Sequence, residues 1–167
     1  FGSSVAFDRR LFEDDVHGSI AWSEAIERAG VLTAEDGAAI RQALEELLAR
    51  GGDPSFFASA EAASDEDVHS FVERELVARV GEAGRRLHTG RSRNEQVALD
   101  LRLYLKRRIP PVQRALAAVV GALVDRAEAA GDALMPSYTH LRRAQPILVA
   151  HFFLAHVAAL RRDHRRL

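Results

Sequence analysis

The sequence predicts an all-α fold, with a small N-terminal helical domain followed by the first long helices of a central helix bundle. Helix start and stop signals recur along the chain, whereas no alternating strand pattern of useful length is present. In addition, residues 92–130 have the sequence of one very long helix. We therefore assign residues 1–88 to the first domain and residues 89–167 to the second.

Three helices are expected in the first domain. The earliest covers about residues 16–29. Thr33 is the expected N-cap of the next helix because Asp36 follows three residues later, and Ser64 with Asp67 repeats this start signal. Glycine favours the position after a helix end, so the expected stop signals are Gly30, Gly51 and Gly81.

The second domain is expected to need partners. A helix of about 38 residues spans roughly 57 Å, whereas a compact globule of this chain length is about 40 Å across. Pro110 and Pro111 would bend it or begin a second helix nearly in line. Residues 115–124 and 147–160 are apolar all round, which predicts burial on every side. With 10 and 14 residues they are too short to cross a membrane, so they indicate a bundle centre shared between subunits.

Composition and charge limit the class of protein. Of the 167 residues 47% are hydrophobic and 28% charged, which is ordinary for a soluble globular protein. The absence of cysteine excludes disulfides and suits a reducing cytoplasm, the location we expect. Residues 1–82 hold 7 Lys and Arg against 18 Asp and Glu, whereas residues 83–167 hold 16 against 6. The partner of the basic half is a small anion, a nucleic acid or the acidic half.

The stretch TGRSRNEQ, which surrounds Ser92, is a candidate anion site. Ser92 and Glu95 form a capping box, so a helix begins here and its free N–H groups and dipole favour an anion. Arg91 and Arg93 add forked donors that suit a carboxylate or phosphate, and Asn94 adds an amide. From local shape alone, a capped helix with two solvated arginines is the more frequent arrangement.

Two further stretches carry polar chemistry. In MPSYTHLRRAQPI, Pro136 and Pro146 enclose a short loop, and Pro146 suits the first turn of the next helix. The histidine of this loop, His140, is of a type that moves protons near neutral pH, although a lone histidine more often serves structure. In SDEDVHS, the acids that end at Asp67 belong to a first helical turn, and His69 follows. A metal site is one interpretation there, but such acids usually serve as caps.

The segments LHTGRSRNEQVALDLRLYLK and MPSYTHLRRAQPI together resemble the first two signature regions of the argininosuccinate lyases, which belong to the fumarase/aspartase superfamily. DEDVHS and DRRLFEDDVHGSIAWSEAIERAG, with their spacings, are also similar to the N-terminal region of that family. The resemblance covers nearly the whole chain. It is specific because fumarases and adenylosuccinate lyases carry other residues in place of GRSRN.

The resemblance implies an all-α homotetramer with a central bundle of long helices and active sites assembled from three subunits. The implied reaction, a step of arginine biosynthesis, is β-elimination of argininosuccinate to arginine and fumarate without a metal or organic cofactor. Neither nucleic acid nor membrane is an implied partner.

By position in the matching motifs, the resemblance also implies the site residues. Thr139 and His140 are the implied catalytic residues, placed against the part of the substrate that becomes fumarate. The implied substrate-binding residues are Ser19, Asp67, Arg91, Ser92, Arg93 and Asn94. In the family a serine-rich loop far downstream supplies the base, so we expect an N-terminal portion with little or no activity by itself.

Three alternatives remain. Arg142 stands where glutamine is common in the family, which makes another succinyl-amino compound an alternative substrate. A structural relative without catalysis is the second alternative. Nucleic-acid binding by the basic half is the third, but its arginines fall on core-type helices without interleaved aromatic residues.

Overall fold

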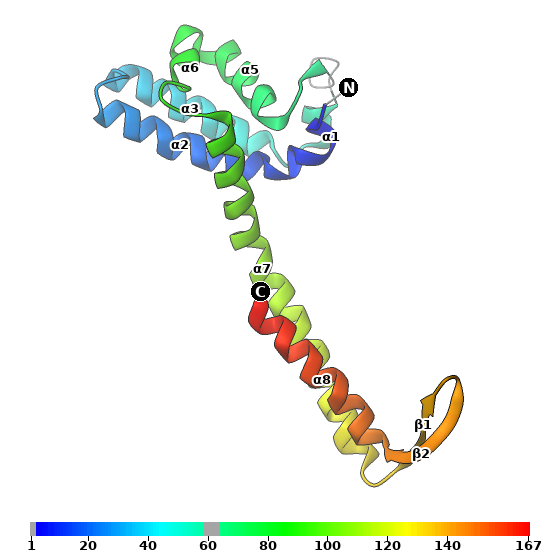
Figure 1. The fold of residues 1–167 in the computed structure, drawn as a ribbon. Coiled ribbons are helices and arrows are strands. Elements are labelled where there is room, and N and C mark those ends of the chain that lie inside the picture. The colour runs from blue at the N-terminus through cyan, green and yellow to red at the C-terminus, as the bar shows by residue number, and fades with distance from the viewer. Residues whose placement is uncertain (1–2, 59–63) are drawn as a thin grey trace. The chain divides into compact units, whose positions relative to one another are not determined.

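The computed structural model describes residues 3–58 and 64–167, and the chain forms two compact units, Phe1–Leu105 and Lys106–Leu167. Apart from one two-stranded sheet, the regular structure of the described residues is helical (Figure 1), which confirms the all-α prediction. None of the helices in the described part has the length and apolar character that crossing a bilayer requires. The predicted division into domains stays a prediction.

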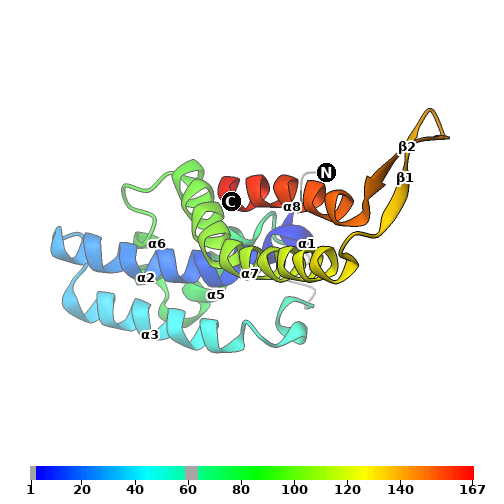
Figure 2. The same cartoon turned by 90° about the horizontal axis from the view of Figure 1, so that it is seen from below.

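The first unit consists of helices around one apolar core. Its elements are α1 (Val5–Asp8), η1 (Arg9–Leu11), α2 (Phe12–Arg28), α3 (Ala34–Arg50), η2 (Pro54–Phe57), α5 (Val68–Val80), α6 (Glu82–Arg86) and the beginning of α7 (Arg93–Ala130). In both views α2 and α3 run side by side (Figures 1 and 2), and α5 packs against them. Leu44, Leu47, Phe71 and Leu76 are completely buried in this core.

Helix ends in the first unit follow local capping signals, with one correction. As predicted, Thr33 caps α3, because its hydroxyl accepts a backbone N–H three residues later at 3.1 Å. The cap of α5 is Asp67 rather than Ser64, since the Asp67 carboxylate accepts the backbone N–H of Ser70 at 2.6 Å. The two acids before Asp67 therefore precede the helix instead of forming its first turn. Gly81 ends α5 with a φ of 60°.

The long helix predicted over residues 92–130 is confirmed as α7, which has 38 residues. Pro110 and Pro111 lie inside it, so they neither end the helix nor begin a second one. Each proline removes one backbone N–H from the hydrogen-bond ladder of the helix. Because the two are adjacent, both losses fall within a single turn, and the helix continues beyond it.

The second unit contains the rest of α7, the strands β1 (Leu134–Thr139) and β2 (Arg142–Leu148), and α8 (Val149–Arg166). α8 runs back along the last part of α7 in both views (Figures 1 and 2), and the Gln113 side chain donates to the carbonyl of His164 at 3.5 Å. The prediction of a loop between Pro136 and Pro146 is wrong. These residues form an antiparallel hairpin in which the two prolines face each other. An edge strand tolerates proline because its outer N–H groups need no partner strand.

The apolar segments of the second unit are not enclosed within the single chain. None of residues 115–124 is buried, and of residues 147–160 Val157 alone is buried. Phe152 and Leu154 are 42% and 46% exposed. The predicted burial on every side is therefore not provided by this chain itself.

Candidate functional site

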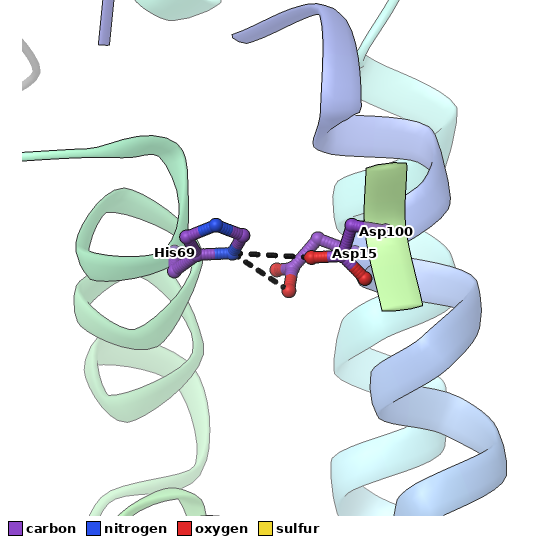
Figure 3. Close-up of side chains that lie close together, drawn as sticks. All are labelled: Asp15, His69 and Asp100. Atoms are coloured by element: carbon purple, nitrogen blue, oxygen red, sulfur yellow. Dashed lines mark hydrogen bonds and ion pairs between the residues drawn. The ribbon is translucent and has the colours of Figure 1, made fainter. Parts of the chain in front are cut away.

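Three buried titratable side chains meet inside the first unit, each from a different helix (Figure 3). Asp15 belongs to α2, His69 to α5 and Asp100 to α7. The Nδ1 atom of His69 is 3.1 Å from Oδ1 of Asp15 and 3.3 Å from Oδ2 of Asp100. The side chains are at most 2% exposed, so solvent screens their charges little.

The periodicity of two helices brings these groups together. Asp15, Ser19 and Ser23 follow each other at intervals of four residues, so they share one face of α2, and all three are buried. Gln96 and Asp100 are also four residues apart and buried, on α7. The side-chain amide of Gln96 donates to Asp15 Oδ1, which joins the two polar faces inside the unit.

Burial and mutual charge set the protonation of the three groups. Burial alone would raise the pKa of Asp15, but the hydrogen bond and charge of His69, the amide of Gln96 and the charge of Arg91 lower it below its usual value. Burial would lower the pKa of His69, but the hydrogen bond and charge of Asp15, with the charge of Asp100, raise it. Burial and the charge of Asp15 raise the pKa of Asp100 to about 7.

Arg93 connects this buried group to the surface. Its Nη1 atom donates to Oε1 of Gln96 at 3.2 Å, and the same Gln96 donates to Asp15 on the other side. The Arg93 side chain is 36% exposed and lies 3.8 Å from Oδ2 of Asp67 and 3.6 Å from Oε2 of Glu73. A buried carboxylate, a buried amide and a partly exposed guanidinium are thus linked by two successive hydrogen bonds.

In contrast to Arg93, the side chain of Arg91 points into the interior of the first unit. Its Nη1 atom donates to the hydroxyl of Ser19 at 3.0 Å, and Ser19 is 1% exposed. Burial lowers the pKa of Arg91, although the charges of Asp15 and Asp100 oppose this effect. Arg91 therefore anchors the segment before α7 to α2 from the inside.

Ser92 and Glu95 form the predicted capping box at the start of α7. The backbone N–H of Ser92 donates to Oε2 of Glu95 at 3.2 Å, and the backbone N–H of Asn94 donates to the Ser92 hydroxyl at 3.3 Å. Ser92 and Asn94 are exposed. The cap fixes the first turn of α7, on which Arg93 and Asn94 lie side by side in sequence.

Asp67 combines a capping role with a position beside Arg93. Its carboxylate accepts from the backbone of Ser70 and lies within ion-pair distance of Arg93. Burial would raise its pKa, but the hydrogen bonds from Ser70 and the charge of Arg93 lower it. Asp67 therefore stays ionised near neutral pH and contributes negative charge at the beginning of α7.

Thr139 and His140 belong to the second unit, at the tip of the hairpin, and both are exposed. Thr139 pairs with Arg142, so His140 and Leu141 form a two-residue turn. Their φ angles are 50° and 60°, the values of a type I′ turn, which normally takes asparagine or glycine. The turn therefore holds two ordinary L-residues in a strained backbone region.

The structure thus gathers six predicted site residues around the start of α7 and the helices beneath it: Ser19, Asp67, Arg91, Ser92, Arg93 and Asn94. The residues that sequence reasoning missed are Asp15, Gln96 and Asp100. The four-residue spacings from Asp15 to Ser19 and from Gln96 to Asp100 were a signal that could have revealed them.

Asp15, His69 and Asp100 are also the one group of three or more ligand-type side chains in the described part of the chain that could hold a metal ion. Their nearest ligand atoms lie within 4.8 Å of one another. A ligating histidine must present a free ring nitrogen, whereas the two carboxylates beside Nδ1 of His69 raise its pKa, so a proton and a metal ion would compete for this position. The contacts between the three side chains are those of an ion-paired cluster.

The sequence matches a family of lyases over residues 1–167. The chain belongs to this lyase family, the fumarase/aspartase superfamily. The match over residues 1–167 agrees with the superfamily resemblance of the sequence motifs.

Solved structures share the fold of this chain. An EDDS lyase variant with bound fumarate is 24% identical, with a TM-score of 0.74 over 94% of this chain. A fumarate lyase from Mesorhizobium sp. BNC1 is 23% identical, with a TM-score of 0.71 over 93%. A fumarate lyase:delta crystallin from Brucella melitensis is 19% identical, with a TM-score of 0.75 over 99%. The chain spans 30%, 36% and 42% of their respective lengths.

Proposed function

We propose that the protein containing this chain is an argininosuccinate lyase, which splits argininosuccinate into arginine and fumarate by β-elimination. Membership of the lyase family supports the reaction class. The motifs TGRSRNEQ and MPSYTHLRRAQPI support the substrate through their resemblance. The observation that carries the proposal is the state of Arg93, whose guanidinium is held by Gln96 at the start of α7 and stays 36% exposed.

The chemistry of the substrate explains this arrangement. Argininosuccinate carries three carboxylates, and removal of a proton beside one of them creates a dianionic aci-carboxylate. Fixed donors aimed at that developing charge lower the barrier. In the proposal, Arg93 and Asn94 bind a carboxylate at the N-terminus of α7, where the helix dipole adds to the attraction. Ser92 fixes that helix start, and Arg91 with Ser19 supports it from inside.

Thr139 and His140 complete the proposed site from the hairpin tip, against the part of the substrate that becomes fumarate. The strained turn at His140 and Leu141 supports this role, because left-handed conformations of non-glycine residues are retained mainly where function requires them. In the proposed homotetramer each active site combines different regions of three subunits. His140 would then act on a substrate that Arg93 of another subunit holds.

One observation favours a second substrate class. The hairpin register places Arg142 opposite Thr139, so a cation stands across the strand from a proposed catalytic residue. A lyase that acts on another succinyl-amino compound with an additional acidic group would use this cation. A non-catalytic structural relative would use neither Arg142 nor His140.

Fumarate release by the intact protein, followed by ultraviolet absorbance, tests the proposal. We expect turnover with argininosuccinate and at least a hundredfold loss of kcat/KM in Arg93→Ala, the loss typical of an oxyanion-stabilising donor. The matched control is Arg28→Ala, because Arg28 is an exposed arginine of α2 in a surface ion pair with Glu24. Turnover only with a different succinyl adduct supports the second substrate class. Full activity of Arg93→Ala contradicts the assigned anion site. If no succinyl adduct is turned over, the proposal that the protein is a catalytic lyase is wrong.

A further inference from the structure

Gln96 lies between two groups of opposite and fixed hydrogen-bonding character. Asp15 is an acceptor when ionised, whereas the guanidinium of Arg93 has donors only. The amide of Gln96 therefore has one possible orientation, with its NH₂ toward Asp15 and its oxygen toward Arg93. Gln96 is 3% exposed, so water cannot easily replace either bond.

We propose that Asp15 and Gln96 are positioning residues that fix the guanidinium of Arg93 for carboxylate binding, with the buried charge of Asp15 setting the orientation of the Gln96 amide. This inference rests on the proposed function, because it takes the role of Arg93 from there. It assigns a purpose to a buried carboxylate and a buried amide that the elimination chemistry does not itself require.

The cluster behind Gln96 keeps Asp15 in the required state. Nδ1 of His69 lies 3.1 Å from Asp15 Oδ1, and although burial opposes it, the hydrogen bond and charge of His69 and the charge of Arg91 lower the pKa of Asp15. Asp15 is 0% exposed, and its helix α2 is part of the apolar core of the unit. Asp15, the acceptor end of the hydrogen-bond relay from Asp15 through Gln96 to Arg93, is consequently both ionised and enclosed.

A neutral amide is a suitable anchor for a guanidinium that must bind an anion. A carboxylate in direct contact with Arg93 would neutralise the charge that a substrate carboxylate needs. Asp67 and Glu73 lie at 3.8 and 3.6 Å from Arg93, which are ion-pair distances longer than a hydrogen bond. Gln96 makes the short contact at 3.2 Å and adds no charge of its own.

The first test is the affinity of the intact protein for fumarate, measured by titration calorimetry, which needs no turnover. Gln96→Met keeps the size of the side chain but removes the amide, and we expect about a tenfold weaker Kd. Asp15→Asn keeps an acceptor but removes the charge, and we expect a smaller loss in the same direction. Because the relay acts through Arg93, Gln96→Met should cause no further loss in an Arg93→Ala background.

The outcomes separate the relay from the proposed function. An unchanged Kd in Gln96→Met, with a weaker Kd in Arg93→Ala, overturns the relay and leaves the anion site intact. Equal losses from Gln96→Met in both backgrounds also overturn the relay, because they indicate a general structural role. An unchanged Kd in Arg93→Ala overturns both inferences. Ser23→Ala is the matched control, since Ser23 is buried on the same face of α2 but bonds only the carbonyl of Ile20 among its described contacts.

A second measurement does not involve fumarate. In the ligand-free protein, NMR of arginine side chains reports hindered rotation of a guanidinium that is held by a hydrogen bond. We expect hindered rotation for Arg93 in the wild type and free rotation in Gln96→Met. If Gln96→Met does not fold, Gln96→Asn provides the same comparison, because its shorter side chain cannot bond Asp15 and Arg93 together. Equal rotation in wild type and variant overturns the relay.

Discussion

The charges of Asp15, His69 and Asp100 shift one another's pKa values. The pKa of Asp15 is lowered and that of His69 is raised, whereas Asp100, with a pKa of about 7, changes charge near neutral pH. An ionised Asp100 gives the cluster two carboxylates against one imidazolium in a buried site. The protonated form of Asp100 is therefore the one that folding favours.

This assignment predicts that the first unit loses stability as the pH rises from 6 to 8. Asp100 has a folded pKa of about 7, above its ordinary value of 3.8, so its contribution is complete below pH ~4 and is lost as the pH rises through 7. His69, with a raised pKa, contributes below about pH 6.5 and loses its contribution as the pH passes its folded pKa. The expected decrease is ~1 kcal/mol in the free energy of unfolding, measured by urea denaturation.

Asp100→Asn is the control for this pH dependence. The amide cannot ionise, so the decrease between pH 6 and 8 should shrink to the part that His69 contributes. Asp36→Asn changes a carboxylate that pairs with Arg86 at the surface and should leave the slope unchanged. A wild-type protein that is equally stable at both pH values would contradict the assigned protonation of Asp100.

Local sequence could predict only part of the site. The Ser92 and Glu95 box lies within four residues, so the sequence contains all the atoms that form it. His69 meets Asp15 across 54 positions, and Gln96 meets Asp15 across 81. These contacts depend on how α2, α5 and α7 pack, which no local pattern encodes. The sequence therefore predicts the exposed end of the network and misses its buried end.

At the scale of elements, helices were predictable because their caps and periodicity are local. Thr33 and Gly81 mark real helix ends, and the helical pattern of residues 92–130, which continues across Pro110 and Pro111, corresponds to α7. The hairpin was not predictable, because Pro136 and Pro146 indicate a loop and the strands lack alternating apolar residues. The two strands are stabilised by pairing with each other once the turn has formed. The sequence pattern of one strand by itself therefore does not reveal them.

The hairpin turn leads to a prediction about strain. Leu141 has a φ of 60° and is 99% exposed, so its side chain gains nothing by burial while its backbone is strained. Leu141→Gly should stabilise the hairpin by up to ~1 kcal/mol and slow hydrogen exchange of the amides of β1 and β2. Leu134→Gly, in the exposed first position of β1, should speed exchange instead. Faster exchange in Leu141→Gly would show that the turn is not strained.

At the scale of the whole molecule, the two units differ in how completely they bury their apolar side chains. The first unit has an enclosed core that includes Val16, Ile40 and Phe71, each fully buried. The second unit leaves Val119 and Leu154 about half exposed. Exposed apolar helix surfaces of this kind are typical of surfaces that other parts of a protein or other chains cover, and the proposed assembly of several subunits would cover those of α7 and α8.

The chain spans 30–42% of the length of the similar solved structures, and the resemblance to the argininosuccinate lyases implies that a serine-rich loop outside residues 1–167 supplies the base. We therefore predict that residues 1–167 by themselves have little or no activity. The proposed anion site around Arg93 belongs to the first unit and should still form in the isolated chain. We expect fumarate release by the purified 167-residue chain to be at least a thousandfold slower than by the intact protein, because the removal of a catalytic base costs this much or more. Circular dichroism and the pH-dependent stability of the Asp15 cluster would show that the first unit is folded. Turnover of the folded chain close to that of the intact protein would mean that the residues described here contain the base, and His140 would then be the first candidate.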